Sequence, residues 1–415
     1  MKRRTFLAAT TAAATLQLAR PALAQSSRKI SFLTWNIADA ADIVNSWIAD
    51  FTKARPGVEV EWLDKKGPEL PAFYQTQLVA GTPPDIINTQ GALGLEYAAS
   101  GALLDLTPLL ARQADVKARF NADYLDNWAM EGRNWMLPFY ISKSLMFYNK
   151  TLFAKAGLAG PPTSFDELMN AAEKIGTGDN TGFITLNFDW LYWPLFAMNA
   201  VQLLTPDLKA PAFNTAQAAD VMARLARGTQ GQAVDKISWT GRWVEPLGAF
   251  AAGRIGMLQA HSPAYYFVKG QGPWVNADTL GAAQMPGNWA TPNSHGLGIS
   301  KGSKHPELAW EFITFITSTP QAAKLVNTRR ILSANKELDA ALLARLEKEE
   351  PLAAAVLRTQ VEHTDRMCGN WRLAHDSRIK EAFYPELQNV MLGRKDAKTA
   401  LADAERKVAR ELRRA

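Results

Sequence analysis

Alternating apolar and polar blocks in the first hundred residues predict a chain that builds strand-helix-strand units. An apolar run over 30–36 predicts a strand, and the spacing after it predicts a helix over 39–54. A Pro-Gly turn precedes a second predicted strand that ends at Trp62, and the segment 82–88 predicts a third. Because β-α-β order places strands side by side and parallel, the pattern favours a parallel sheet with helices on both faces.

The stretch 135–176 predicts a strand, a short helix, a proline-rich turn and a capped helix. Residues 141–148 are rich in apolar and aromatic side chains, which predicts a buried strand. Two prolines at 161–162 prevent the short helix from continuing. Thr163 is the predicted cap of the next helix, because Thr163-x-x-Asp166 is similar to a capping box. Gly176 is expected to end that helix.

Length and composition indicate more than one core. A chain of 415 residues exceeds what one ordinary hydrophobic core supports, so two lobes are expected. Hydrophobic residues make up 47% and charged residues 21%, which is typical of globular proteins. Thirteen tryptophans are unusual for this length, and more than half of them are expected in the core.

The first 24 residues have the features of a removable export signal. Lys2, Arg3 and Arg4 form a charged start, an apolar region follows, and 22–24 reads Ala-Leu-Ala, a cleavage pattern. The apolar region is too short to span a bilayer of about 30 Å. Residues 3–7, Arg-Arg-Thr-Phe-Leu, resemble the twin-arginine pattern, with an ordinary Sec signal as the alternative. We expect cleavage after residue 24 and release into the periplasm.

Charge and cysteine content exclude several classes of protein. The whole chain carries +6, and residues 1–24 contain four basic and no acidic residues, so the mature chain carries 6 − 4 = +2. This balance is not that of a nucleic-acid-binding protein, and no nucleic-acid partner is expected. Cys368 is the single cysteine, so no disulfide within the chain is expected.

Four blocks of sequence resemble the family 1 extracellular solute-binding proteins of ABC importers, the maltose-binding-like group. The blocks are 135–176, Gly-Thr-Pro-Pro-Asp-Ile at 81–86, Phe-Ala-Ala-Gly-Arg-Ile-Gly-Met at 250–257, and the return strand and helix at 298–312. Together they extend over nearly the whole mature chain. In this family the strand within 135–176 crosses from the first lobe to the second beside the ligand.

The resemblance implies a two-lobed α/β periplasmic binding protein fold, each lobe a mainly parallel sheet flanked by helices. The expected limits are 1–24 for the signal, 25–138 plus 291–330 for lobe one, and 139–290 plus 331–415 for lobe two. It further implies a monomer, without enzymatic activity, cofactor or metal, that captures a sugar or polyol by hinge closure. The implied partners are that small molecule and the membrane subunits of an ABC permease.

The resemblance also implies which residues face the ligand. They lie where predicted strands end, at the crossover, or in loops that hold a ligand-facing aromatic in relatives: Trp35, Asn36, Asn88, Gln90, Tyr140, Ser142, Trp190, His261, Trp371 and Arg372. Aromatic faces contact the C–H face of a sugar, while amides and guanidinium groups bind its hydroxyls. For each of these residues the alternative is core packing or a solvated loop.

Two other functions stay open on the sequence alone. A site for a glycerophosphodiester or other phosphorylated polyol would need cations, which Arg242, Arg366 and Arg372 could supply. An exported hydrolase would use Gly298-x-Ser300-x-Gly302, which matches a serine-hydrolase elbow. That elbow requires a helix beginning at the serine, whereas here the helix is expected near Pro306. No zinc-protease motif and no phosphate-binding loop is present.

Overall fold

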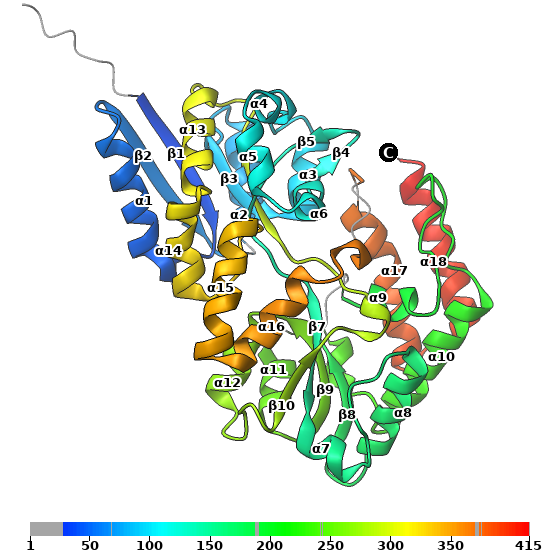
Figure 1. Cartoon of the computed structure of the whole chain (residues 1–415). Helices are drawn as coiled ribbons and strands as arrows, with labels where there is room; N and C mark the ends of the chain where they lie inside the picture. Colours follow the sequence, from blue (N-terminus) through cyan, green and yellow to red (C-terminus); the bar gives the residue numbers. More distant parts are fainter. Residues whose placement is uncertain are drawn as a thin grey trace, which may run out of the picture.

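The computed structural model describes residues 28–67, 69–186, 191–240, 242, 244–369, 373–374 and 376–414. Two mixed sheets, each flanked by helices, form two lobes joined by several crossing segments (Figure 1). No helix within the described ranges has the length and apolar character that crossing a membrane requires. The residue limits expected above for the two lobes remain a prediction.

The first sheet has the order β2-β1-β3-β11-β6. Its strands are β1 (Arg28–Trp35), β2 (Val58–Lys65), β3 (Ile86–Gln90), β6 (Leu137–Tyr140) and β11 (His295–Ile299). As expected from the β-α-β order, β1 pairs in parallel with both β2 and β3. β11 returns from much later in the chain and runs antiparallel between β3 and β6. The amino end of β11 therefore lies beside the carboxyl ends of its neighbours.

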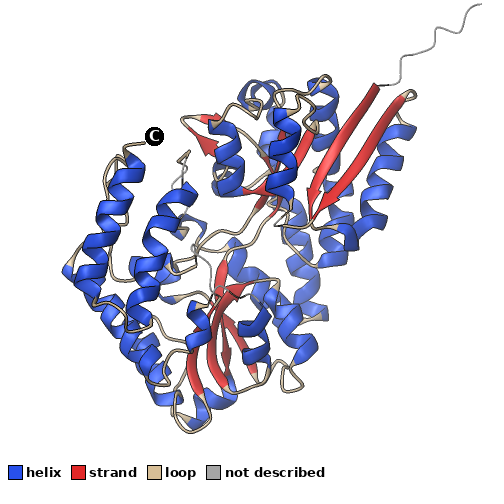
Figure 2. Cartoon of the chain, turned by 180° about the vertical axis from the view of Figure 1, so that it is seen from behind, coloured by secondary structure: helices blue, strands red, loops and turns tan. Residues whose placement is uncertain are grey.

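Helices cover both faces of this sheet (Figure 2). They are α1 (Ala41–Lys53), α2 (Leu70–Val79), α3 (Gly91–Ala99), α4 (Thr107–Arg112), α5 (Ala114–Arg119), α6 (Ala122–Asp126), α13 (Pro306–Ile316) and α14 (Thr319–Arg329). A two-stranded hairpin, β4 (Ala129–Met130) and β5 (Arg133–Asn134), follows α6.

The second sheet has the order β10-β7-β9-β8. Its strands are β7 (Ser144–Asn149), β8 (Thr181–Thr185), β9 (Ile255–His261) and β10 (Leu280–Ala283). β8 and β9 are parallel, while β7 runs against both of its neighbours. Three of the four strands thus share one direction, and β7 is reversed because it enters from the first lobe.

Helices from three parts of the chain surround the second sheet. They are α7 (Lys150–Lys155), α8 (Phe165–Ile175), α9 (Trp193–Ala197), α10 (Ala216–Gln230), α11 (Val244–Ala251), α12 (Ala264–Gln271), α15 (Lys336–Glu349), α16 (Pro351–Val361), α17 (Asp376–Met391) and α18 (Ala397–Leu412). The last two pack against each other and against α10, on the side where the chain ends (Figure 1).

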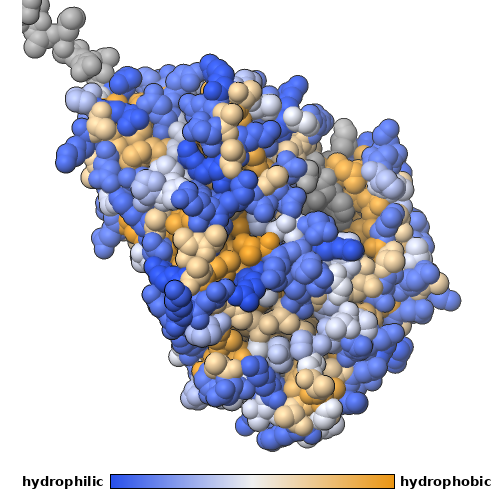
Figure 3. All heavy atoms as spheres, in the orientation of Figure 1, coloured by the Kyte–Doolittle hydropathy of each residue, from blue (hydrophilic) through white to orange (hydrophobic). Residues whose placement is uncertain are grey.

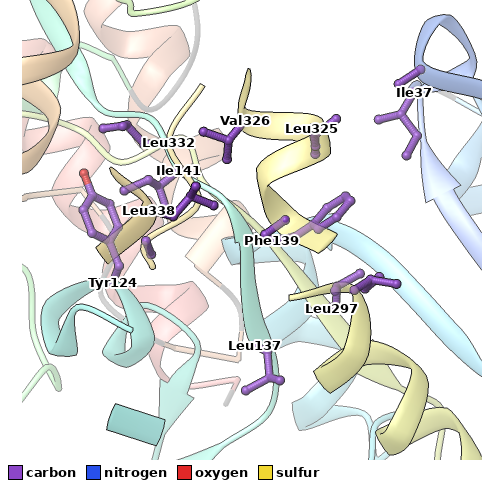
Figure 4. Packing of buried hydrophobic residues seen from close by; sticks show 14 of the residues in the cluster. Ile37, Tyr124, Leu137, Phe139, Ile141, Leu297, Leu325, Val326, Leu332 and Leu338 are labelled. Atoms are coloured by element: carbon purple, nitrogen blue, oxygen red, sulfur yellow. The ribbon is translucent and has the colours of Figure 1, made fainter. Parts of the chain in front are cut away.

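A continuous apolar core runs behind the crossing segments. Phe139 in β6 and Ile141 just after it pack with Leu325 and Val326 of α14 and with Leu332 beyond α14 (Figure 4). The space-filling view shows a mostly hydrophilic surface with small apolar patches, one of them at the waist between the lobes (Figure 3). Residues of both lobes thus belong to one buried apolar cluster at the crossing segments.

The helix α8 begins one residue later than the expected cap. Ser164, not Thr163, is the N-cap, and its Oγ accepts a hydrogen bond from the N–H of Glu167 at 3.1 Å. The Glu167 carboxylate accepts bonds from the N–H and the hydroxyl of Thr163, both at 2.7 Å. Asp166 instead pairs with Arg224. The prediction was wrong by one position because Glu167, not Asp166, completes the box.

The strand expected over 141–148 is observed as β7, which begins three residues later, at Ser144, and ends at Asn149. β6 ends at Tyr140 in the first sheet, so residues 141–143 form a short segment between the two sheets. Ile141 in this segment bridges to Leu332, and Lys143 bridges to Pro292. The crossing segments are therefore hydrogen-bonded to one another rather than independent linkers.

Candidate ligand-binding cleft

A pocket lies where the two sheets face each other across the crossing segments. Its walls come from β3 and α3, from the end of α6, from the crossing segment before β11, and from the start of α17. The lining residues are Gln90, Gly91, Ala92, Asn127, Trp128, Thr291, Pro292, Asn293, Ser294, Gly369 and Lys380. Both lobes thus contribute to one site, as ligand pockets between domains commonly do.

The crossing segments hold the floor of this pocket in register. The N–H of Ser144 donates to the carbonyl oxygen of Thr291 at 2.9 Å, and the N–H of Thr291 donates to the Ser144 hydroxyl at 2.9 Å. The N–H of Asn293 donates to the carbonyl oxygen of Ser142 at 2.7 Å. These bonds fix the backbone while leaving the side chains of 291–294 on the pocket wall.

Two buried polar groups in the pocket wall have no hydrogen-bond partner among the described residues. The indole N–H of Trp128 and the hydroxyl of Thr291 are buried, and no acceptor or donor among the described residues satisfies either. Buried polar groups in native structures are nearly always hydrogen-bonded, and leaving one unpaired costs about 1–3 kcal/mol. Both atoms are therefore candidates for hydrogen bonds to a bound molecule.

Trp128 lies close to the backbone of β11. A Cβ atom at Gly296 would come within 2.9 Å of the Trp128 ring, so only glycine fits there. The missing side chain at Gly296 thus leaves room for the Trp128 ring close to the strand.

Lys380 is the one charged side chain on the wall among the described lining residues. Its side chain is 7% exposed, and its ammonium lies 2.7 Å from the carboxylate of the fully buried Asp376, one turn earlier in α17. Burying such a pair is costly unless further hydrogen bonds complete it. The ion pair balances the charge of Lys380 at the pocket wall.

Three aromatic rings meet beside the pocket at the end of the first sheet. His295 stacks on Tyr140 with ring centres 4.4 Å apart. Trp35 lies edge-on to His295, with ring centres 5.6 Å apart. Burial lowers the pKa of His295 to about 3, so its ring is neutral at neutral pH. Burial raises the pKa of Tyr140, which stays a phenol. Trp35 and Tyr140 were expected here, and both are only partly buried.

His261 and Ser142 are buried and are not among the lining residues of the pocket, and their expected contact with a ligand stays a prediction. His261 ends β9 opposite Ser144 and is fully buried, which lowers its pKa to about 3. The hydroxyl of Ser142 is 3.3 Å from that of Ser262, within the crossing segments. Both residues support the floor of the cleft from below.

Asn88 has a structural role. Its side-chain oxygen accepts a bond from the N–H of Trp35 at 3.3 Å, and its amide donates to the carbonyl oxygen of Gly296 at 3.0 Å. The side chain is fully buried and joins β1, β3 and β11. Asn36 is exposed after β1 with φ of 53°, and Gln90 lines the pocket. Ligand contact by either residue stays a prediction.

The predicted residues Trp190, Trp371 and Arg372 lie outside the described residues. The sequence did not point to Trp128, Thr291, Asn293, Ser294, His295 or Lys380. Several of the predicted site residues lie at the carboxyl ends of strands expected to be parallel, whereas the Asn-Ser-His run precedes β11, which is antiparallel. Lys380 gave no distinct signal, because Asp and Lys four residues apart are common on solvated helix faces.

The serine-hydrolase elbow is not formed. Ser300 lies beyond the end of β11 that is distant from the cleft, is 1% exposed, and bonds to Tyr74 and to the carbonyl oxygen of Pro84. The following helix begins at Pro306, as expected. Across the described residues there is no group of acidic, histidine or cysteine side chains suited to a metal ion.

Residues 34–323 match the family model described as bacterial extracellular solute-binding protein. The diacetylchitobiose binding protein DasA of Streptomyces coelicolor is 23% identical over 75% of this chain and 75% of its own. The sn-glycerol-3-phosphate-binding periplasmic protein UgpB of Agrobacterium fabrum is 29% identical, over 42% of this chain and 45% of its own.

Among solved structures, the sugar-binding protein MalE of Xanthomonas citri superposes with a TM-score of 0.79. The two proteins are 20% identical, and the match covers 93% of this chain and 98% of MalE. At that identity the likeness concerns the fold, and it confirms the two-lobed α/β architecture expected from the sequence.

Proposed function

The chain belongs to the family of bacterial extracellular solute-binding proteins, which are not enzymes, and we propose that it captures a neutral sugar or polyol between its lobes. Capture would proceed by hinge closure, in which the ligand selects the closed state by touching both lobes. The closed protein would then deliver the ligand to the membrane subunits of an ABC permease.

The observation that carries this proposal is the pair of unpartnered polar groups in the inter-lobe pocket. Trp128 and Thr291 offer an indole N–H and a hydroxyl, and Lys380 adds an ammonium. Amides of Gln90 and Asn293 lie on the same wall. A molecule rich in hydroxyl oxygens, with apolar C–H faces for aromatic rings, matches this set of groups.

Charge balance in the pocket favours a neutral ligand over a phosphorylated one. Lys380 is neutralised by Asp376. Arg242 is exposed and pairs with Glu245, and Arg366 lies over the Trp289 ring; neither lines the pocket. The likeness to UgpB keeps a phosphorylated polyol as the second candidate, with Arg372 as the remaining predicted cation.

Export to the periplasm would follow from the signal over 1–24, through the twin-arginine route. Replacing Arg3 and Arg4 with lysine should then retain precursor in the cytoplasm, because that route requires both arginines. Unimpaired export of the double variant would indicate a Sec signal.

A thermal-shift panel tests the proposed ligand class. Purified mature protein is melted with neutral mono- and disaccharides, polyols, glycerol 3-phosphate and glycerophosphodiesters. A ligand that binds only the folded state raises the melting temperature, by an amount that grows with concentration over Kd. Shifts with neutral sugars or polyols support the proposal, whereas shifts confined to the phosphorylated compounds favour the second candidate.

A further inference from the structure

A second cavity lies beside the crossing segments, and it shares no lining residue with the inter-lobe pocket. Its volume is about 160 Å³. The walls come from α6 of the first lobe, from α15 and α16 of the second, and from two crossing segments, which contribute Ile141 and Ala334. This second cavity is called the rear cavity below.

The rear cavity and the inter-lobe pocket flank the crossing segments from opposite edges. The segment between β6 and β7 is the middle one, because its backbone binds partners on both sides. The N–H of Ile141 donates to the carbonyl oxygen of Leu332 at 2.9 Å, whereas the carbonyl of Ser142 and the N–H of Ser144 bind the segment 291–293. In an extended chain the backbone groups of successive residues point to opposite sides. The two partner segments therefore lie on opposite edges, with one cavity against each.

Most of the rear cavity is apolar. Its apolar lining residues are Ile141, Ala334, Ala340, Leu343 and Val361. Tyr124 lies on the same wall close to Ile141 (Figure 4), but its hydroxyl donates to the carbonyl oxygen of Gln360 at 2.6 Å. An apolar cavity of about 150 Å³ is large enough to hold a benzene ring. The rear cavity therefore has room for one small molecule with an apolar body.

One buried carboxyl group lines this apolar space. Asp339 of α15 is 4% exposed. Its Oδ1 accepts hydrogen bonds from the N–H of Ser333 at 2.9 Å and from the Ser333 hydroxyl at 3.0 Å. Among the described residues Asp339 has no cationic partner, and burial raises its pKa to about 7. Lys336, one turn earlier, is exposed at the mouth, where water and salt screen its charge.

We propose that the rear cavity is a second binding site, for a small organic amine whose ammonium group pairs with Asp339 and whose apolar body lies against Ile141 and Leu343. A buried carboxylate without a cation is costly, and an ammonium group offsets that cost with a charge-assisted hydrogen bond. Capture of a sugar between the lobes does not require this site.

The bound amine also favours closure of the inter-lobe cleft. Both cavities have walls from both lobes, and the crossing segments lie between them. A rotation of the lobes that opens the cleft on one edge narrows the rear cavity on the other. An amine in the rear cavity resists that narrowing and so raises the affinity for the sugar, and by linkage the sugar raises the affinity for the amine. This coupling rests on the proposed function, whereas binding of the amine does not.

The first test titrates ligand-free mature protein with benzylamine, and with benzyl alcohol as a neutral probe of the same shape, by ligand-observed NMR. Asp339→Asn removes the charge and keeps an acceptor for Ser333. Ala340→Trp fills the cavity from the exposed side of α15. Glu337→Gln is the matched control, because Glu337 is exposed on the same helix and does not line the cavity.

We expect the parent protein to bind benzylamine at least about tenfold more tightly than benzyl alcohol. Asp339→Asn should remove this preference, Ala340→Trp should weaken both probes at least about tenfold, and Glu337→Gln should match the parent. Because Ala340 is exposed, Ala340→Trp tests the site even if Asp339→Asn does not fold. The site is overturned by equal binding of the two probes, by no saturable binding of benzylamine, or by parent-like affinity in Ala340→Trp.

The second test measures the affinity for a sugar from the thermal-shift panel by calorimetry, without and with saturating benzylamine. Sugar binding should become about three- to tenfold tighter in the parent and stay unchanged in Ala340→Trp. An unchanged sugar affinity in the parent with benzylamine bound would overturn the coupling. The first test contains no sugar, so its failure is distinct from a failure of the thermal-shift panel.

Discussion

At the scale of the residue, the cleft depends on polar groups that the fold leaves unpaired. Thr291 is the clearest case, because its backbone N–H and carbonyl are bound to Ser144 while its buried hydroxyl has no partner among the described residues. Such a group lowers the stability of the empty protein and is available to a ligand. Stability and binding should therefore respond to its removal in opposite directions.

We predict this response for Thr291→Val, which keeps the shape and removes the hydroxyl. The free energy of unfolding should stay constant or rise by about 1 kcal/mol, and affinity for a sugar found in the panel should fall about 5- to 10-fold. Thr229→Val is the matched control, because the Thr229 hydroxyl donates to Leu225 and accepts from the Trp239 indole, away from the cleft. That variant should lose stability and keep its affinity. Calorimetric titration measures the affinity of both variants, and urea unfolding measures their free energy of unfolding. Equal affinity in Thr291→Val and the parent would show that the Thr291 hydroxyl does not bind the ligand.

A second prediction at this scale concerns pH. Burial lowers the pKa of His295 to about 3, so the unfolded chain binds a proton that the folded chain does not. The contribution of the neutral ring to the free energy of unfolding is fully present above about pH 6.5. It is lost as the pH falls toward 3, with a loss of roughly 2 kcal/mol between pH 6.5 and pH 5. His295→Phe should show a shallower fall than the parent in urea unfolding over this range. Taking the difference from the parent cancels other groups, such as Asp339, whose pKa burial raises to about 7. Parallel curves for the two proteins would show that the ring is not buried neutral.

At the scale of the element, sequence patterns located the strands β1, β2, β3, β7 and β11 and several helices. Beyond the parallel pairing at the start of the chain, they did not show which strands pair with one another. The sequence located α8 to within one residue at its start and correctly at its end, because a Pro-Pro turn and a following glycine mark the two ends. The sequence predicted the return strand β11 but not its antiparallel direction, which places its amino end beside the pocket. Strand direction depends on contacts far apart in the sequence, so the pocket residues before β11 and on α17 were missed.

The cap of α8 supplies a prediction at this scale. Ser164→Ala should lower the free energy of unfolding by about 1 kcal/mol, because it removes the acceptor for the Glu167 N–H. Thr163→Ala should cost less, since the backbone N–H of residue 163 still donates to Glu167. Urea unfolding of the two variants measures the difference. A larger loss in Thr163→Ala would restore the original cap assignment.

At the scale of the whole molecule, the account requires that the lobes move relative to each other. The crossing segments are bonded together at 141–144, 291–294 and 331–334 and packed on a shared core, so we expect them to bend together as one hinge. A ligand in the pocket would touch Thr291 in the hinge, Trp128 in the first lobe and Lys380 in the second. Binding should therefore change the shape of the molecule and not only the pocket.

Small-angle X-ray scattering of the mature protein, without and with a saturating sugar or polyol from the thermal-shift panel, tests the central claim most directly. Closure of the cleft predicts a smaller radius of gyration in the saturated sample, with no change for a panel compound that fails to shift the melting temperature. Identical scattering curves with and without a bound ligand would contradict capture by lobe closure.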